Sequence, residues 1–391
     1  MKIIFLLCFS TISFVNARSS NILPFHACET NAFPPSQSDA VPRFTIDLDL
    51  PPRERWAELM AKKGHQVVGL IDDVKTLMLS LLGDKIFYFI YDNLPKVATS
   101  LPHPYDEEII GISKVTGLPL PETTLYNIFY EVFSFCTSII TEDETGRLYH
   151  GRNLDFGLLM GWDTKNHTWR VSELLKPLVV HLEWKKGGKT VYESINYAGY
   201  IGILTAVKKE KFTFSLDERF VLNGGYMGFL EWILFKDYSQ KWVSFLTREV
   251  MEEAQSYEEA KKMFSHSRLI APAYFILGGS KPREGTIITR WRDNFHTDDL
   301  FSKKSGSGTW YLVETNYDQW KSPPFYDDRR TPAVTCLDKS GQKNASLALI
   351  YNVLSTKPVF NKLTTYTSLM DVQEGYIGAW LRYCEDPCWP W

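Results

Sequence analysis

The chain has 391 residues, a formal net charge of −3 and 14% aromatic residues, and its composition is otherwise ordinary for a globular protein. The balance is slightly acidic and lacks the basic excess of a nucleic-acid-binding protein, so we expect no nucleic-acid partner. The length is above the usual size of one domain and is sufficient for a sizeable hydrophobic core.

The first segment has the pattern of a secretory signal. Lys2 precedes an almost wholly apolar run over residues 3–15, and small residues follow where a signal peptidase would cut. We therefore expect residues 1–17 to be removed and the remaining chain to be lumenal or extracellular. Two glycosylation sequons, at Asn166 and Asn344, agree with this compartment and predict surface positions.

The segment before residue 130 is predicted to be mainly helical. Residues 29–52 are rich in Pro and Ser and predict an extended leader. Apolar residues then recur at helical spacing between residues 53 and 94, which predicts two or three amphipathic helices. The stripe from Leu77 to Ile90 is expected to lie in the core, with contact to a membrane as the alternative. A loop at 101–104 and a further helical stretch follow.

The pattern changes to that of a β-hairpin at Cys136. Two strands and the turn between them are predicted at residues 136–141, 147–156 and 142–146. If Glu142 pairs with Arg147, Cys136 lies opposite Asn153, with a boundary error of about two residues.

The remaining elements are a mixture of strands and helices. Strands are predicted at 178–184, 190–196, 202–207, 212–216, 273–277, 286–291 and 310–315. Helices are predicted at 226–236, 242–254, 257–265, 346–355, 365–372 and 376–383, and a capping box at Ser256 opens the third. Hairpin sheets with helices on both sides indicate a layered α+β domain that begins at Cys136.

Five cysteines remain after removal of the signal, so one is expected to be unpaired. Cys384 and Cys388 have a spacing that a local disulfide can close around a proline turn, and Cys28 and Cys336 would then pair across the chain. Cys136 would keep a free thiol in an oxidising compartment. It could be a buried structural thiol, but we interpret it as a catalytic nucleophile.

The surroundings of Cys136 suit acyl transfer. An attacking thiol needs a base, a cation that stabilises the thiolate and an oxyanion site. Arg152 and Asp155 would lie within reach of Cys136 across the hairpin, although alternation along a strand places them on opposite faces unless a bulge intervenes. A strand that begins at a cysteine also suggests an N-terminal nucleophile, because self-cleavage would free an α-amino group with a pKa of about 7.7 to 8 as the base.

The sequence resembles the acid ceramidase family, which belongs to the superfamily of N-terminal nucleophile hydrolases. The motifs that carry the resemblance are Cys136-Thr137-Ser138-Ile139, residues 150–157, Asp217-Glu218-Arg219-Phe220, residues 223–232, residues 269–279, Thr315-Asn316-Tyr317-Asp318 and residues 327–332. The resemblance covers essentially the whole mature chain. It implies an αββα sandwich with a mainly helical α subunit over residues 18–135 and a catalytic β subunit over residues 136–391. It also implies that the two subunits arise from one precursor by self-cleavage.

The resemblance implies a role for each residue of the site. Cys136 would first attack the Phe135 carbonyl, which splits the precursor, and would then attack the amide of ceramide, so that sphingosine leaves and water releases the fatty acid. Arg152 would stabilise the thiolate, and Asp155 would hold the new α-amino group. Asn316 would supply an amide N–H to the oxyanion. No metal or cofactor is expected.

Glu218 and Arg329 would belong to the same centre and set its electrostatics. Simpler interpretations exist, since Asn316 could be a turn residue and residues 327–330 could be a solvated charge run. Phe135 at the cleavage position departs from the aliphatic residue that we expect there.

The expected activity is therefore hydrolysis of ceramide and related N-acyl lipids in the lysosome, at membrane surfaces and with a lipid-transfer protein as helper. The related N-acylethanolamine acid amidases are the nearest alternative, and the cysteine pattern disfavours them. A second alternative is a secreted lipid-binding protein without activity, which the presence of Cys136, Arg152, Asp155 and Asn316 disfavours.

Overall fold

The computed structural model describes residues 25–98, 100–128, 134–156, 161–219, 228, 231–232, 237–302 and 310–390. The predicted signal and most of the predicted helix at 226–236 lie outside the described residues. So do most side chains of the stripe from Leu77 to Ile90, although its backbone is helical. In the part of the chain that is described, no helix is long and apolar enough to cross a membrane.

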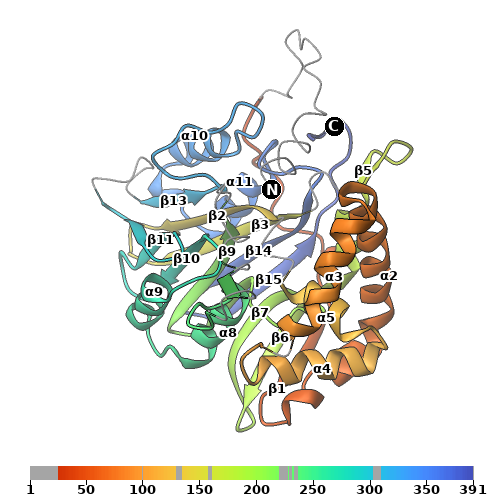
Figure 1. Cartoon of the computed structure of the whole chain (residues 1–391). Helices are drawn as coiled ribbons and strands as arrows, with labels where there is room; N and C mark the ends of the chain where they lie inside the picture. The colour runs from red at the N-terminus through yellow and green to blue at the C-terminus, as the bar shows by residue number, and fades with distance from the viewer. Residues whose placement is uncertain are drawn as a thin grey trace.

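Two β-sheets are stacked face to face at the centre of the molecule (Figure 1). The larger sheet consists, in spatial order, of β1 (Arg43–Asp47), β6 (Val179–Lys186), β7 (Lys189–Tyr197), β8 (Thr205–Lys208), β9 (Phe212–Glu218), β10 (Ala273–Gly279), β11 (Gly285–Arg290) and β12 (Phe295–Asp299). The smaller sheet consists of β13 (Tyr311–Glu314), β2 (Ser134–Glu142), β3 (Leu148–Phe156), β14 (Thr364–Asp371) and β15 (Tyr376–Leu381). Within both sheets the neighbours are antiparallel, except that β1 runs parallel to β6.

Helices cover the outer faces of both sheets. The larger sheet contacts α8 (Val243–Glu253) and α9 (Tyr257–His266), and the smaller sheet contacts α10 (Arg330–Ser340) and α11 (Leu347–Ser355). The Ser256 side chain accepts a hydrogen bond from the Glu259 backbone N–H, so the predicted cap of α9 is confirmed. This arrangement is the predicted αββα sandwich.

The segment before the hairpin forms a helical layer beside the sandwich, coloured orange in Figure 1. It contains α2 (Ala57–Leu82), α3 (Asp84–Ala98), α4 (Tyr105–Thr116) and α5 (Leu120–Ile128). Short elements elsewhere are β4 (Trp162–Asp163), β5 (Thr168–Trp169) and α6 (Arg170–Leu175). Buried Glu108 in α4 forms an ion pair with Arg248 in α8 at 3.1 Å, which connects the helical layer to the sandwich.

The leader is attached to the sandwich more firmly than an extended segment would be. It contains β1, which pairs with β6 so that Arg43 lies opposite His181. The predicted disulfide between Cys28 and Cys336 is present and joins the leader to α10. Residues before and after the hairpin are therefore held together by both strand pairing and a covalent bond.

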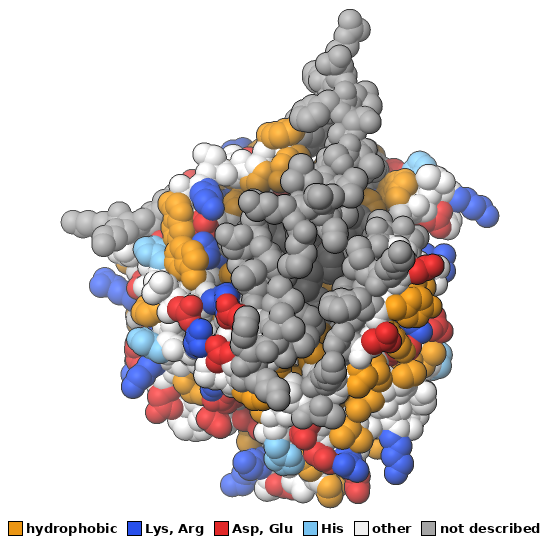
Figure 2. Space-filling model, in the orientation of Figure 1, with side chains coloured by type: hydrophobic (Ala, Val, Ile, Leu, Met, Phe, Trp, Pro, Cys, Tyr) orange, Lys and Arg blue, Asp and Glu red, His pale blue; other side chains and the backbone are white. Residues whose placement is uncertain are grey.

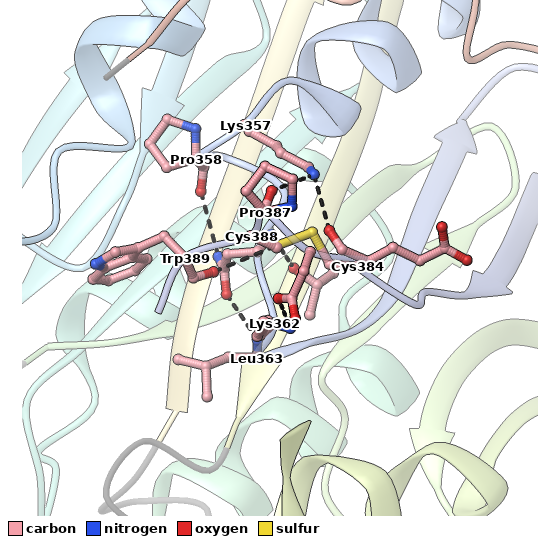
Figure 3. Close-up of a disulfide and its surroundings, with 12 residues drawn as sticks. Lys357, Pro358, Lys362, Leu363, Cys384, Pro387, Cys388 and Trp389 are labelled. Atoms are coloured by element: carbon pink, nitrogen blue, oxygen red, sulfur yellow. Dashed lines mark hydrogen bonds and ion pairs between the residues drawn. A yellow bond between two sulfur atoms is a disulfide. The ribbon is translucent and has the colours of Figure 1, made fainter. Parts of the chain in front are cut away.

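The tail is held by the second predicted disulfide, between Cys384 and Cys388 (Figure 3). Lys357 Nζ donates to the Pro387 carbonyl at 2.7 Å, and the Lys362 backbone N–H donates to the Trp389 carbonyl at 2.9 Å. The tail is thus tied to the segment that precedes β14.

Two predicted helices, at 365–372 and 376–383, are wrong, because these residues form the strands β14 and β15. Every residue of β14 is buried, since the strand lies inside the sandwich. A strand that is covered on both faces loses the apolar and polar alternation by which strands are recognised. The β-branched threonines at 364, 365 and 367 do favour a strand. The polar strand β12 and the helix α10 were not predicted.

Charges of both signs are interspersed on the described part of the face shown in Figure 2. Hydrophobic side chains lie among them. This mixed surface agrees with the small net charge of −3.

Candidate active site

The hairpin of β2 and β3 determines which side chains lie beside Cys136. Cys136 pairs with Leu154, one residue away from the predicted partner. The connecting loop contains Gly146 with φ of +88°, a conformation that glycine adopts without strain. Because side chains alternate along a strand, the shift by one residue places Arg152 on the same face as Cys136 and Asp155 on the opposite face.

The Cys136 thiol is fully buried and in contact with a guanidinium group. Arg152 Nη2 donates to Cys136 Sγ at 2.5 Å. Arg152 Nη1 donates to the Leu204 carbonyl at 3.0 Å and to Thr205 Oγ1 at 3.2 Å, which fixes the guanidinium against the larger sheet. A cation in this position stabilises a thiolate relative to a thiol.

The backbone of Cys136 is held by two residues from distant segments. Its N–H donates to Asn316 Oδ1 at 2.5 Å, and its carbonyl accepts from Arg329 Nη1 at 2.5 Å. Asn316 has φ of +71°, a region that asparagine tolerates better than most residues. Its Nδ2 donates to the Glu218 carbonyl at 2.7 Å. Asn316 therefore connects the start of β2 to the end of β9, and Glu218 contacts it through the main chain.

Arg329 is buried and is surrounded by acceptors. Its guanidinium forms an ion pair with Asp327 at 2.7 Å, contacts Asp155 Oδ2 at 3.5 Å and donates to Asn316 Oδ1 at 3.0 Å. These carboxylates raise the pKa of Arg329 despite its burial. The interpretation of residues 327–330 as a solvated charge run is wrong for Asp327 and Arg329.

Asp155 lies on the face of β3 away from the thiol. It is opposite Phe135 in the hairpin register, and its Oδ2 accepts from Asn361 Nδ2 at 3.0 Å. Burial raises the pKa of Asp155 to about 6, although Arg329 and hydrogen bonds from Thr364 and Asn361 oppose the shift. Asp155 thus belongs to the same cluster through Arg329 and the main chain, without contact to the sulfur.

The structure brings all six predicted residues into one connected group and adds others that the sequence left without a role. Asp217 contacts both Arg152 and Ser138. Asp327 contacts Arg329. Only Ser138 could have been found from a local pattern, since it is two residues after Cys136 on the same strand and must share its face. Asp217 and Asp327 arrive from distant segments, so no local pattern could identify them. Among the described residues, no group of three or more His, Cys, Asp or Glu side chains could hold a metal ion.

Comparison with protein families defines the class. Residues 136–335 match the linear amide C–N hydrolases, choloylglycine hydrolase family, and this range contains the buried thiol and its partners. Residues 39–101 match the beta subunit of N-acylethanolamine-hydrolyzing acid amidase. The fold and the family match are therefore those of an amide hydrolase.

Individual relatives define the family more narrowly than these two family matches do. The acid ceramidase of Heterocephalus glaber is 48% identical over 368 residues, which cover 93% of this chain and 92% of that protein. The acid ceramidase of Homo sapiens is 47% identical with the same coverage, 93% and 92%. A solved structure of the Caenorhabditis elegans N-acylethanolamine-hydrolyzing acid amidase ortholog is 31% identical, with a TM-score of 0.53, and covers 63% of this chain and 100% of that chain. The chain belongs to the acid ceramidase family.

Proposed function

We propose that the protein hydrolyses the amide bond of ceramide and related N-acyl lipids to sphingosine and a fatty acid, with Cys136 as nucleophile. The observation that carries this proposal is the 2.5 Å contact between Cys136 Sγ and Arg152 Nη2 inside a fold of amide hydrolases. Acid ceramidases that are 47 to 48% identical over 93% of the chain support ceramide as the substrate.

Activation would begin with self-cleavage between Phe135 and Cys136. Cys136 Sγ adds to the Phe135 carbonyl carbon, the C–N bond breaks with a proton transferred to the nitrogen, and water hydrolyses the resulting thioester. The products are an α subunit over residues 18–135 and a β subunit over residues 136–391. The Cys28–Cys336 disulfide and the pairing of β1 with β6 would keep them together.

In the cleaved enzyme the Cys136 α-amino group would take the proton of the thiol. The thiolate, stabilised by Arg152, attacks the amide carbon of the lipid, and the amine leaves with the proton from the α-amino group. Water then releases the fatty acid from the thioester. Arg329 donates to the Cys136 carbonyl, and Asn316 Oδ1 accepts from the Cys136 N–H, so both residues hold the backbone of the nucleophile. The oxyanion role expected of Asn316 would use its Nδ2, which donates to the Glu218 carbonyl, and Asp155 lies across from Phe135, close to the new amino group.

The loop between β13 and α10 supports a lipid substrate. Its inner side provides Asn316 and Arg329 to the site, while Trp320, Phe325 and Tyr326 are 52, 82 and 57% exposed on its outer side. Exposed aromatic side chains next to a site suit contact with a membrane surface or with a protein that delivers lipid.

The compartment that fits these features is the lysosome, reached through the secretory pathway after removal of residues 1–17. Both sequon asparagines, Asn166 and Asn344, are exposed and could carry glycans. These proposals rest on the sequence pattern and on the relatives.

Hydrolysis of N-acylethanolamines is a second candidate. The match of residues 39–101 and the structural likeness at 31% identity favour it. A lipid-binding protein without activity would be favoured only if the assembled site proved inert.

Lipid hydrolysis by the two-chain protein tests the proposal. Ceramide and N-palmitoylethanolamine are compared by kcat/KM in the same detergent, with Cys136→Ala and iodoacetamide-treated wild type as controls. We expect faster hydrolysis of ceramide and none in either control. Faster hydrolysis of the ethanolamide would favour the acid amidase, and no hydrolysis of either lipid would favour a binding protein.

A further inference from the structure

Asp217 is a fully buried carboxylate at the centre of the sandwich for which the proposed chemistry provides no role. It lies in β9, and its Oδ1 forms an ion pair with Arg152 Nη2 at 3.4 Å. The same Oδ1 accepts a hydrogen bond from Ser138 Oγ at 2.9 Å. Nη2 of the guanidinium therefore contacts both the Cys136 sulfur and the Asp217 carboxylate.

Ser138 connects this carboxylate to the strand of the nucleophile. It is two residues after Cys136 on β2 and lies opposite Arg152 in the hairpin register. The three side chains consequently share the face of the smaller sheet that packs on β9. The hydrogen bond from Ser138 therefore holds the Asp217 carboxylate at a fixed position relative to the Cys136 thiol and the Arg152 guanidinium.

Further hydrogen bonds hold Ser138 in turn. Ser215 Oγ contacts Ser138 Oγ at 2.8 Å, His150 Nε2 contacts Ser215 Oγ at 2.9 Å, and His150 Nδ1 contacts Thr213 Oγ1 at 3.0 Å. Burial, with a smaller effect of Arg152, lowers the pKa of His150 to about 3, so the imidazole is neutral. The chain of hydroxyl groups is anchored on both sheets without adding a second charge beside Arg152.

We propose that Asp217 is a positioning residue, which together with Ser138 holds the Arg152 guanidinium so that Nη2 faces the Cys136 sulfur. This inference rests on the proposed function, because it assumes that the thiolate is the nucleophile. Displacement of a catalytic group by about 1 Å can slow a reaction about 100-fold. Asp217 contacts Arg152 and Ser138, so its loss should lower kcat and leave KM within about twofold.

The test compares Asp217→Asn, Asp217→Ala and Ser138→Ala with wild type. Asparagine keeps the acceptor oxygen and removes the charge, so Asp217→Asn should retain more activity than Asp217→Ala. The matched control is Asp371→Asn, because buried Asp371 pairs with Arg147 at 2.5 Å at the far end of the same hairpin. For each protein we would measure kcat, KM, the rate of self-cleavage and the temperature of unfolding.

We expect kcat to fall about 10- to 100-fold in Asp217→Asn and about tenfold in Ser138→Ala, with KM unchanged and Asp371→Asn close to wild type. If Asp217→Asn does not fold, Ser138→Ala decides. Equal kcat in Ser138→Ala and wild type, a change in KM alone, or a matching loss in Asp371→Asn would overturn the role of Asp217. Inert wild-type protein would instead contradict the proposed function, so the two failures are distinguishable.

Discussion

Glu314 provides a quantitative test of how burial controls the charges around the site. It ends β13, lies opposite Ser138 and is fully buried. Burial raises the pKa of Glu314 from 4.5 to about 8, although Arg330 and a hydrogen bond from Gln319 oppose the shift. At neutral pH the folded protein therefore keeps this carboxyl protonated.

A carboxyl group whose pKa is higher in the folded state binds its proton more tightly after folding. Its contribution to stability is therefore complete below pH 4.5 and is lost as the pH rises toward 8. The loss between pH 4.5 and pH 7 amounts to about 3 kcal/mol, from about 1.4 kcal/mol for each pH unit over most of this interval. Glutamine at position 314 does not ionise, so Glu314→Gln should abolish this part of the pH dependence.

Urea unfolding of single-chain protein measures the effect. Cys136→Ala serves as the parent, since it should remain uncut and unfold as one chain. The free energy of unfolding of the parent should fall by about 3 kcal/mol more than that of its Glu314→Gln variant between pH 4.5 and pH 7. His150 is common to both proteins, and its titration cancels in the comparison. Glu144→Gln, in the exposed hairpin turn, should behave like the parent. An equal fall in the parent and the Glu314→Gln variant would refute the reasoning.

Three further predictions follow from the contacts described above. Lysine in Arg152→Lys cannot reproduce the forked contacts of the guanidinium, so self-cleavage should slow at least about 100-fold. The appearance of two chains on reducing gels measures this rate, and an unchanged rate would exclude a role of the guanidinium in self-cleavage. Cys28→Ser or Cys336→Ser should let the two chains separate on non-reducing denaturing gels, where wild type should remain joined; chains that stay joined would show another covalent link. Glu108→Gln leaves Arg248 buried with a weaker partner, so it should lower the free energy of unfolding by about 3 to 5 kcal/mol at pH 7. The pKa of Glu108 is lowered by Arg248 despite burial, so the contribution of this pair should disappear as the pH falls below 4.5.

The hairpin shows how far local sequence patterns can determine a site. The two strands were predicted, but β2 begins at Ser134, two residues before the cysteine at which the strand was expected to start, and the pairing differed by one residue. That small error matters, because a shift by one residue exchanges the faces of a strand. With Cys136 opposite Asn153, alternation would put Asp155 on the face of Cys136, whereas the observed pairing with Leu154 puts Arg152 there. Loop geometry, and not strand propensity, decides between the two.

The rest of the site depends on contacts between distant segments. Asn316 and Arg329 contact Cys136 although they follow it by 180 and 193 positions in the sequence. No periodicity reports such contacts, and the resemblance to a family was needed to select these residues. Asp217 belongs to the motif at residues 217–220, but its contacts with the site form only when β9 packs on β2.

The two misassigned helices have a different cause. The strand at 364–371 is buried between the larger sheet and α11, and the strand at 376–381 lies next to it. Apolar residues therefore occur on both faces of these strands. Their spacing then resembles that of a helix, and only the threonine-rich composition indicated a strand. By contrast, the helices predicted at 257–265 and 346–355 are present as α9 and α11, and the structure shows a serine cap at the start of each.

The most direct test of the central claim is the mass and the N-terminal sequence of the chains after incubation at acid pH. Wild type and Cys136→Ala would be purified as precursors, incubated, reduced and denatured. We expect two chains from wild type, one of which begins at Cys136, and an intact single chain from Cys136→Ala. Wild type that remains a single chain while hydrolysing ceramide would contradict the α-amino group as base, and cleavage of Cys136→Ala at the same bond would contradict self-cleavage by the thiol.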